Sequence, residues 1–236
     1  MRPDVDRPAG IGRERTADPG AERDGERAAA AAAWALCALA DRERRPQAVL
    51  HPLGFLCYPL RRGPGFGICV HVWLPERSDA AAGPAPIHSH SWDLLSQVLV
   101  GRVGNELICA SSAPVESAGH RIYQVHSSAC GVDEIVATAQ CVRCARRETQ
   151  YTEAGRAYRL PGGEFHNSVV PAGTAAATVL VADSLPGGCD RLLGPLYPPG
   201  GDDWRRTVRR PAGPKLSREA AESVLDMARD PFRPAS

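Results

Sequence analysis

The sequence has almost no net charge and no long hydrophobic run. Its 28 Lys and Arg residues balance 27 Asp and Glu residues, which leaves a formal net charge of +1. A broad cationic surface for nucleic acid is therefore not expected. The Ala-rich apolar run at 28–40 is too short and too weakly apolar to span a membrane, and it lies too far from the N-terminus for a secretory signal peptide. These absences predict a cytoplasmic protein that binds neither nucleic acid nor a membrane.

The first 27 residues contain no aromatic residue and are rich in Arg, Asp, Gly, Pro and Glu. Such a composition cannot bury enough apolar surface to offset the entropy of ordering the chain. We expect a disordered tail over 1–27. Alanines and an apolar stretch that includes Trp34 and Leu39 then predict a helix over Glu26–Arg42, and the segment 28–45 is assigned as a flanking helical segment.

Short apolar runs bounded by Gly and Pro begin after Pro46. They predict strands, and many short strands favour a sandwich or barrel over an α/β fold. We assign 46–184 to one barrel, because no internal repeat indicates a second. The span 102–154 is long and is expected to hold an extra hairpin or a loop over the barrel mouth. The predicted strands are Gly54–Leu60, Phe66–Leu74, Ile87–Val100, Val103–Ala110, Arg121–Val125, Glu134–Ala139, Val142–Thr149, Ala157–Leu160, Glu164–Val170 and Ala177–Ala182.

The last segment, 185–236, is rich in Gly, Pro and Arg at its start. Leu185–Pro214 is expected to wrap the outside of the barrel without regular structure. A helix is predicted over Leu216–Arg229, with Ser217 as its N-cap and an apolar stripe that includes Val224.

Two separate segments supply three histidines at informative positions. In His88-Ser89-His90, strand alternation places both imidazoles on one side, about 7 Å apart along the chain. His166 follows a Pro-Gly-Gly turn that starts a new strand, so it is expected to enter the barrel from a neighbouring strand. A single histidine in a strand is more often a core or surface residue, but the conjunction predicts that His88, His90 and His166 hold one metal ion.

The ligand type restricts which metal is expected. Imidazole suits iron, nickel, copper or zinc, whereas calcium or magnesium would need several oxygen ligands. Three neutral ligands leave coordination positions open, which is typical of a catalytic site rather than a closed structural one.

The spacing around His166 matches the second signature motif of the cupin superfamily. The matching positions are Gly155, Pro161, Gly163 and His166, whereas Val170 stands where the motif ends in asparagine. The first cupin motif is matched by His88, His90 and Gly101, while Gly83 lies one residue too close to His88 and Leu94 replaces the usual metal-binding glutamate. The chain therefore resembles a cupin. This resemblance implies an all-β double-stranded β-helix, or jelly-roll barrel, with flanking N- and C-terminal helices.

Leu94 makes the metal-site pattern most similar to that of the three-histidine thiol dioxygenases, the cysteine dioxygenase type of cupin. The resemblance implies Fe(II) and the O2-dependent oxidation of a small polar molecule such as a thiol. Two alternatives remain: an isomerase, lyase or hydrolase that uses zinc, nickel or manganese, and a noncatalytic cupin that binds a small molecule. Since cupins commonly pair through their outer sheets, the resemblance also allows a homodimer.

Three neighbours are candidate catalytic residues. Trp92 shares the inward parity of the histidine pair and is expected to line the pocket, unless it is an ordinary core aromatic. Glu164 shares the side of His166 and could be a general base, the missing carboxylate ligand or a solvated residue at a strand start. Arg61, next to Arg62, could bind a substrate carboxylate or be a turn charge.

The eight cysteines give weaker signals. Cys141 and Cys144 have the spacing of half a zinc site, but no second Cys-x-x-Cys completes it. Four cysteines in apolar surroundings are expected to be buried thiols: Cys37, Cys57, Cys69 and Cys109. His71, in the alternating stretch Ile68–Trp73, is a candidate for a further inward-facing histidine.

Overall fold

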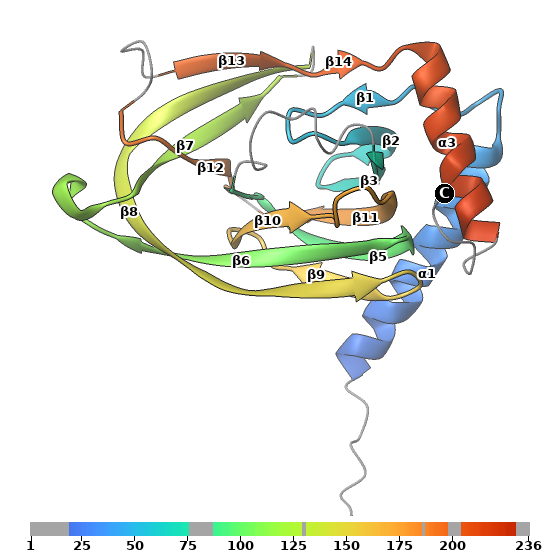
Figure 1. Cartoon of the computed structure of the whole chain (residues 1–236), viewed down its shortest axis with the longest axis horizontal. Helices are drawn as coiled ribbons and strands as arrows, with labels where there is room; N and C mark the ends of the chain where they lie inside the picture. The colour runs from blue at the N-terminus through green and yellow to red at the C-terminus, as the bar shows by residue number, and fades with distance from the viewer. Residues whose placement is uncertain (1–18, 76–86, 129–130, 186, 198–203, 230–236) are drawn as a thin grey trace, which may run out of the picture.

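The computed structural model describes residues 19–75, 87–128, 131–185, 187–197 and 204–229 (Figure 1). Within these ranges the chain forms two seven-stranded sheets whose neighbouring strands are antiparallel. The first sheet has the order β14 (Arg210–Pro211), β1 (Val49–Leu50), β2 (Leu56–Gly63), β3 (Phe66–Trp73), β11 (Ala176–Ser184), β5 (Trp92–Val100) and β9 (Ala157–Leu160). The second has the order β13 (Trp204–Val208), β8 (Val132–Glu153), β6 (Arg102–Ser112), β10 (Phe165–Val169), β4 (His88–Ser89), β12 (Asp190–Gly194) and β7 (His120–Ser127).

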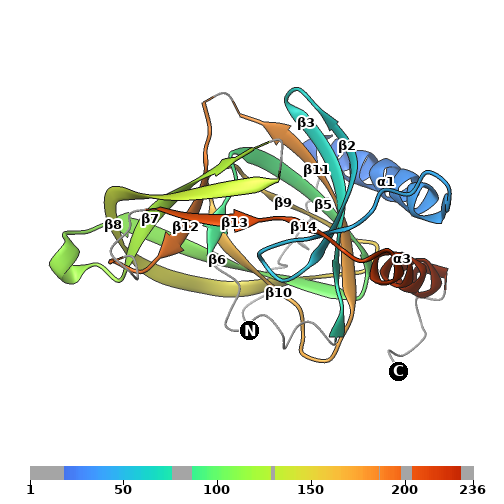
Figure 2. The ribbon, with the colours of Figure 1, turned by 90° about the horizontal axis from the view of Figure 1, so that it is seen from above.

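In the described part of the chain, two α-helices flank the strands, α1 (Pro19–Ala40) and α3 (Pro214–Arg229), and both lie on the same side of the barrel (Figures 1 and 2). A short 3-10 helix, η1 (Val115–Ser117), connects β6 to β7. The predicted all-β jelly-roll barrel with N- and C-terminal flanking helices is confirmed. Among the described residues, neither helix is long and apolar enough to cross a membrane.

Strand alternation divides the first sheet into two faces. Tyr58 on β2 and Val70 and Val72 on β3 are fully buried in a core shared with α1 and α3. The residues at the alternate positions of these strands, such as Cys69 and His71, line a cavity on the other face. Burying each such valine stabilises the fold by roughly 1.5–3 kcal/mol. The helices therefore pack on one face of β2 and β3, and the opposite face of the same strands lines the cavity.

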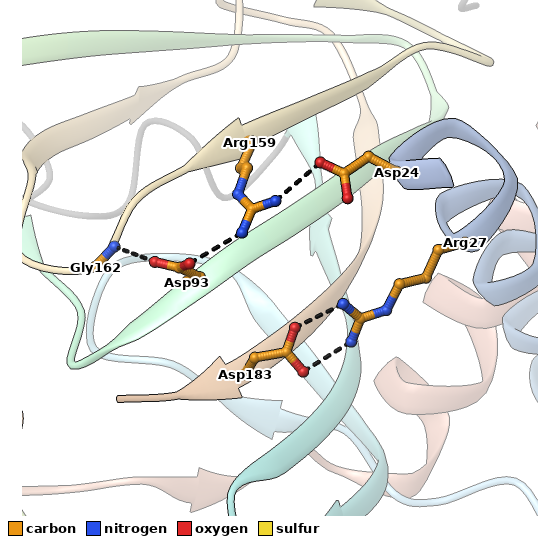
Figure 3. A network of polar contacts seen from close by, with 6 residues as sticks. All are labelled: Asp24, Arg27, Asp93, Arg159, Gly162 and Asp183. Atoms are coloured by element: carbon orange, nitrogen blue, oxygen red, sulfur yellow. Dashed lines mark hydrogen bonds and ion pairs between the residues drawn. The ribbon is translucent and has the colours of Figure 1, made fainter. Parts of the chain in front are cut away.

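The helix α1 begins at Pro19, so residues 19–27 are helical where the sequence analysis expected part of a disordered tail. Ion pairs between this first part of α1 and the barrel explain the difference, because they stabilise the helix through residues that are distant in the sequence (Figure 3). The Arg27 guanidinium donates two hydrogen bonds to Asp183, at 2.6 and 2.7 Å. Arg159 on β9 donates to Asp24, at 2.9 Å. The remainder of the expected tail, 1–18, lies outside the described residues.

The expectation that Leu185–Pro214 lacks regular structure was wrong. This segment contributes β12, β13 and β14, and β12 pairs with both β4 and β7. The segment thus extends the second sheet beside His88. Its strands are ordered by pairing with distant strands, and a local sequence pattern does not contain that information.

The C-terminal helix starts two residues before its predicted start, and Ser217 is not its N-cap. The Ser217 amide donates to the Gly213 carbonyl at 2.9 Å, which places Ser217 within the helix. Its buried hydroxyl instead accepts a hydrogen bond from the Ala48 amide, at 2.9 Å. Pro214 suits the first helical position, since that position needs no amide donor.

Two strand boundaries also differ from the prediction. The predicted strand Ile87–Val100 is interrupted at His90 and Ser91, where the chain passes from β4 in the second sheet to β5 in the first. Conversely, the two strands predicted between 134 and 149 are parts of one long strand, β8, which pairs with both β7 and β6. The β7–β8 hairpin accounts for the extra length of the 102–154 span.

Two motif glycines allow a matched test of backbone constraint. Gly101 and Gly155 both have left-handed backbones, with φ of 69° and 78°. A Cβ at Gly101 would contact the Ala175 carbonyl and Ala176, whereas a Cβ at Gly155 would meet no atom within 4 Å. We expect Gly155→Ala to lower the free energy of unfolding by about 1–2 kcal/mol through strain alone. Gly101→Ala should lower it by at least about 3 kcal/mol, because a steric clash adds to that strain. Urea unfolding measures both losses, and equal losses would contradict the expected clash.

Candidate metal centre

The two histidine segments meet through a turn that docks on the first of them. The Gly163 amide donates to the His90 carbonyl at 2.7 Å, and the Gly162 amide donates to the Asp93 carboxylate at 2.9 Å. Directly after this turn, β10 pairs with β4 and sets His166 opposite His88. Backbone pairing therefore brings residues far apart in sequence into one site.

The structure brings His88, His90 and His166 together as predicted. One ring nitrogen from each lies within 4.8 Å of the others. The ring centroids are 4.9 Å apart for His88 and His90, 4.3 Å for His88 and His166, and 5.3 Å for His90 and His166. Nitrogen donors that share one ion at about 2.1 Å lie at most about 4 Å apart. The three ring nitrogens therefore lie close to the spacing that a shared metal ion requires.

Burial keeps the imidazoles in the form that binds metal. Burial, with smaller effects of the His88 and His166 rings, lowers the pKa of His90 well below its usual range. Burial also lowers the pKa of His166, and a contact with the Glu164 carbonyl partly opposes that shift. A neutral imidazole has a free lone pair for a cation, so a metal ion does not have to displace a proton near neutral pH.

A cavity of about 690 Å³ lies between the two sheets and contains all three histidines. Leu94 points into this cavity, as its predicted parity requires, and packs with Leu160 and Leu180. The position that carries a glutamate in the first cupin motif is therefore an apolar part of the cavity lining and supplies no ligand.

Trp92 lines the cavity as predicted. Its ring stacks on His90 with a centroid separation of 5.2 Å and an interplanar angle of 18°. The indole Nε1 is buried, and no described residue accepts a hydrogen bond from it. Trp92 thus supports one side of His90 and holds a donor with no acceptor from the described chain.

Arg61 also lines the cavity, next to Arg62 at the end of β2. Both arginines are exposed, and the Arg61 guanidinium lies 5.7 Å from the centroid of the Phe66 ring. They are therefore placed at the cavity rim, where a guanidinium can meet an entering anion.

Glu164 is not brought to the histidines. Its side chain is exposed and lines a different pocket, with Arg147 and Arg191 among its neighbours there. The contact of Glu164 with His166 is made by its backbone carbonyl, 3.3 Å from Nδ1. The strand β10 begins at Phe165, so the alternation that placed Glu164 on the side of His166 does not extend to it. This corrects the expectation of a ligand or base at Glu164.

One cavity residue was missed because it belongs to the segment expected to be irregular. Asp190, the first residue of β12, accepts hydrogen bonds from the Ser91 amide and hydroxyl, each at 2.8 Å. Burial raises its pKa, although these hydrogen bonds partly oppose the shift. Only the pairing of β12 with β4 places this carboxyl near His90, and no sequence pattern signals that pairing.

A second ligand cluster lines the same cavity from the opposite sheet. One donor atom from each of Cys57, Cys69 and His71 lies within 4.8 Å of the others. A hydrogen bond from Cys69, supported by His71, lowers the pKa of Cys57 to about 5. The Cys69-x-His71 spacing, equal to that of His88-x-His90, was the available signal. Sequence reasoning treated Cys57 and Cys69 as buried thiols only.

The other cysteines are outside these two clusters. All described cysteines are free thiols, and Cys37 is exposed rather than buried as expected. Cys141 and Cys144 lie on β8, and in the described part of the chain they belong to no group of three ligands.

No family model matches the chain, and no curated protein matches it in sequence. Among solved structures, the polyketide cyclase RemF from Streptomyces resistomycificus is 17% identical over 77% of this chain and 88% of its own, with a TM-score of 0.32. An oxalate oxidase is 16% identical over 79% of this chain and 76% of its own, with a TM-score of 0.35. The hydroquinone 1,2-dioxygenase PnpCD is 12% identical over 54% of this chain and 63% of its own, with a TM-score of 0.33. The geometry of the site remains the basis for assigning a function.

Asp93 offers a test of how the turn positions His166. Asp93→Ala removes the acceptor for the Gly162 amide and one ion-pair partner of Arg159. We expect this change to weaken metal binding about 10-fold, because groups that orient ligands commonly contribute 10- to 100-fold to affinity. Asp93→Asn keeps an acceptor oxygen and should retain most of the affinity. Metal titration of both folded variants checks this, and equal losses would show that the charge rather than the amide contact is responsible.

The buried histidines predict a pH dependence of the metal-free fold. Burial lowers the pKa of His51, as it does for His90 and His166. Below about pH 6.5 the unfolded chain binds protons that the folded chain does not, so stability falls as the pH falls. Each such group contributes up to about 1.4 kcal/mol per pH unit.

Urea unfolding of chelator-treated protein between pH 7.5 and about 5 measures this slope. His51→Gln should reduce the slope, because it removes one histidine whose pKa is lowered in the folded protein. A slope that His51→Gln does not alter would contradict the assignment of His51 as a buried neutral group.

Proposed function

We propose that the chain is a mononuclear non-haem Fe(II) cupin dioxygenase that oxidises a small polar molecule, a thiol or a similar compound, with O2. The observation that carries the proposal is a three-histidine set that faces a cavity, with His88 and His166 buried, His90 partly buried and Leu94 in place of a carboxylate ligand. Imidazole ligands suit ferrous iron, and three of them leave positions for substrate and O2. Bound iron would supply the redox chemistry that allows O2 to react with an organic substrate.

Charge indicates what kind of substrate suits this site. Three neutral imidazoles leave the full charge of a divalent ion uncompensated, and a buried charge requires a partner. An anionic ligand, such as a thiolate or carboxylate, would supply that partner. Arg61 and Arg62 at the rim add two further cationic groups on the way in. We therefore favour a small anionic substrate that binds through two groups.

The remaining cavity residues have defined tasks in this proposal. Leu94 and its leucine neighbours exclude water from the space beside the histidines. The Trp92 indole offers its unused N–H to bound substrate. Tyr158 is partly buried in the cavity lining, and desolvation raises its pKa despite hydrogen bonding to Ser96 and Asn105. Its phenol thus keeps its proton at neutral pH and can act as a hydrogen-bond donor.

Asp190 favours a second candidate function, a metal-dependent isomerase or lyase. A cavity carboxyl whose pKa is raised by burial can exchange a proton with substrate. In that case zinc, nickel or manganese would polarise a carbonyl, and no O2 would be consumed.

The first test uses protein purified without added metal, beside His166→Ala and, as the matched control, His126→Ala. We expect iron near one ion per chain, with loss of at least about 100-fold in iron affinity in His166→Ala, because losing a ligand should cost at least as much as losing a group that only orients one, and little change in the control. The iron-loaded protein should consume O2 with small thiols that carry a carboxylate, and His166→Ala should not. Conversion of substrate by the zinc form under anaerobic conditions would support the isomerase or lyase instead. Absence of metal from the wild-type protein would leave a noncatalytic binding protein as the best account.

A further inference from the structure

The cluster of Cys57, Cys69 and His71 has the composition of a metal site that is separate from the three histidines. Cys57 and His71 are cross-strand partners on β2 and β3, and Cys69 shares the cavity face with His71. The Cys69 sulfur lies 3.6 Å from Nε2 of His71, and the donor atoms of all three residues lie within 4.8 Å of one another. All three donors therefore lie on adjacent strands of one sheet and none lies on a loop, so the backbone pairing fixes their positions.

The surroundings of the cluster hold the imidazole of His71 in place. His71 stacks on Phe55, with ring centroids 4.2 Å apart, and meets the edge of Trp73 at 6.0 Å. Cys57 is buried, and the other two donors are partly buried. A rigid aromatic contact leaves His71 little freedom to turn away from the sulfur atoms, which lowers the entropy cost of binding a cation.

The donor set determines the kind of cation. Two thiolates and one imidazole are soft ligands of the type that bind Zn²⁺ or Cu(I), and they do not suit calcium or magnesium. With Zn²⁺, two thiolates give a site of zero net charge, which is favourable in a buried position. The three-histidine set has no thiolate and would leave a divalent ion with its full charge. The two clusters therefore differ in the ion and the charge that they favour.

We propose that Cys57, Cys69 and His71 form a second, thiolate-containing metal site that binds Zn²⁺ in the same cavity as the three-histidine centre. The ligands come from the first sheet, whereas His88 and His166 come from the second, so the two sites face one interior space from opposite sides. Three protein ligands leave a fourth position of a tetrahedral ion for water or an exogenous ligand.

The test uses reduced, metal-free full-length protein titrated anaerobically with Zn²⁺ and, separately, with Co²⁺ as a spectroscopic probe. We expect about two zinc ions per chain after desalting, and a thiolate-to-Co²⁺ charge-transfer band in the near ultraviolet. Cys57→Ser and Cys69→Ser should each lose one zinc ion and the band. His166→Ala should lose one zinc ion and keep the band, so failure of the three-histidine centre is distinguished from failure of this site.

Cys189→Ser is the matched control, because Cys189 lines the same cavity but is not part of the cluster. It should retain both ions and the band. If circular dichroism shows that a cysteine variant is unfolded, His71→Gln tests the same ligand set. Zinc should also slow alkylation of Cys57 and Cys69, but not of Cys189, in peptide mapping. A single zinc ion with no thiolate band in folded wild-type protein, or a band that persists in Cys57→Ser/Cys69→Ser, would overturn the proposal. So would a Cys57–Cys69 disulfide that O2 forms in the zinc-treated protein as soon as the reductant is removed in air, since bound zinc should protect both thiolates from this oxidation.

Discussion

The contact between the Pro161–Gly163 turn and the His90–Asp93 segment is the interaction on which the site depends. Two backbone amides of the turn bind the His90 carbonyl and the Asp93 carboxylate, at 2.7 and 2.9 Å. Because the turn leads directly into β10, its position fixes where His166 enters the barrel. The same carboxylate pairs with Arg159, which also binds Asp24 of α1 (Figure 3). One hydrogen-bonded contact therefore connects the candidate metal ligands, the second sheet and the N-terminal helix.

Strand alternation does the rest of the positioning. On β2 and β3, one set of side chains packs beneath the helices and the alternate set lines the cavity. A shift of one residue in the pairing would exchange the two sets, placing Val70 and Val72 in the cavity and His71 under the helices. The apolar core thus specifies the register of the functional residues, and the cavity chemistry depends on the same pairing that stabilises the fold.

The sequence was sufficient where a feature depends on local spacing. The three histidines, Leu94 and Trp92 could be placed because short-range alternation and a Pro-Gly-Gly turn determine their direction, even though β4 and β5 belong to different sheets.

Glu164 was misplaced because the strand begins one residue after it. Asp190 could not be found, since its position depends on β12 pairing with β4 across about 100 residues of chain. For Cys57 and Cys69 the missing information was the register between β2 and β3, which only the folded hairpin supplies. The early start of α1 likewise depends on ion pairs with distant residues, which helix propensity does not contain.

The two ligand clusters would give a bound divalent ion different net charges, and this difference suggests a division of roles within one cavity. An ion held by two thiolates and an imidazole is electrically balanced by the protein and needs no further anion. An ion held by three imidazoles keeps its charge, so it attracts an anionic substrate and stabilises negative charge that develops during a reaction. Both clusters line the same space, so the balanced site can shape and rigidify the cavity without competing for that substrate. If the chain is the enzyme proposed above, the three-histidine centre would be the reactive one, and the Cys57, Cys69 and His71 cluster would support the opposite side of the cavity.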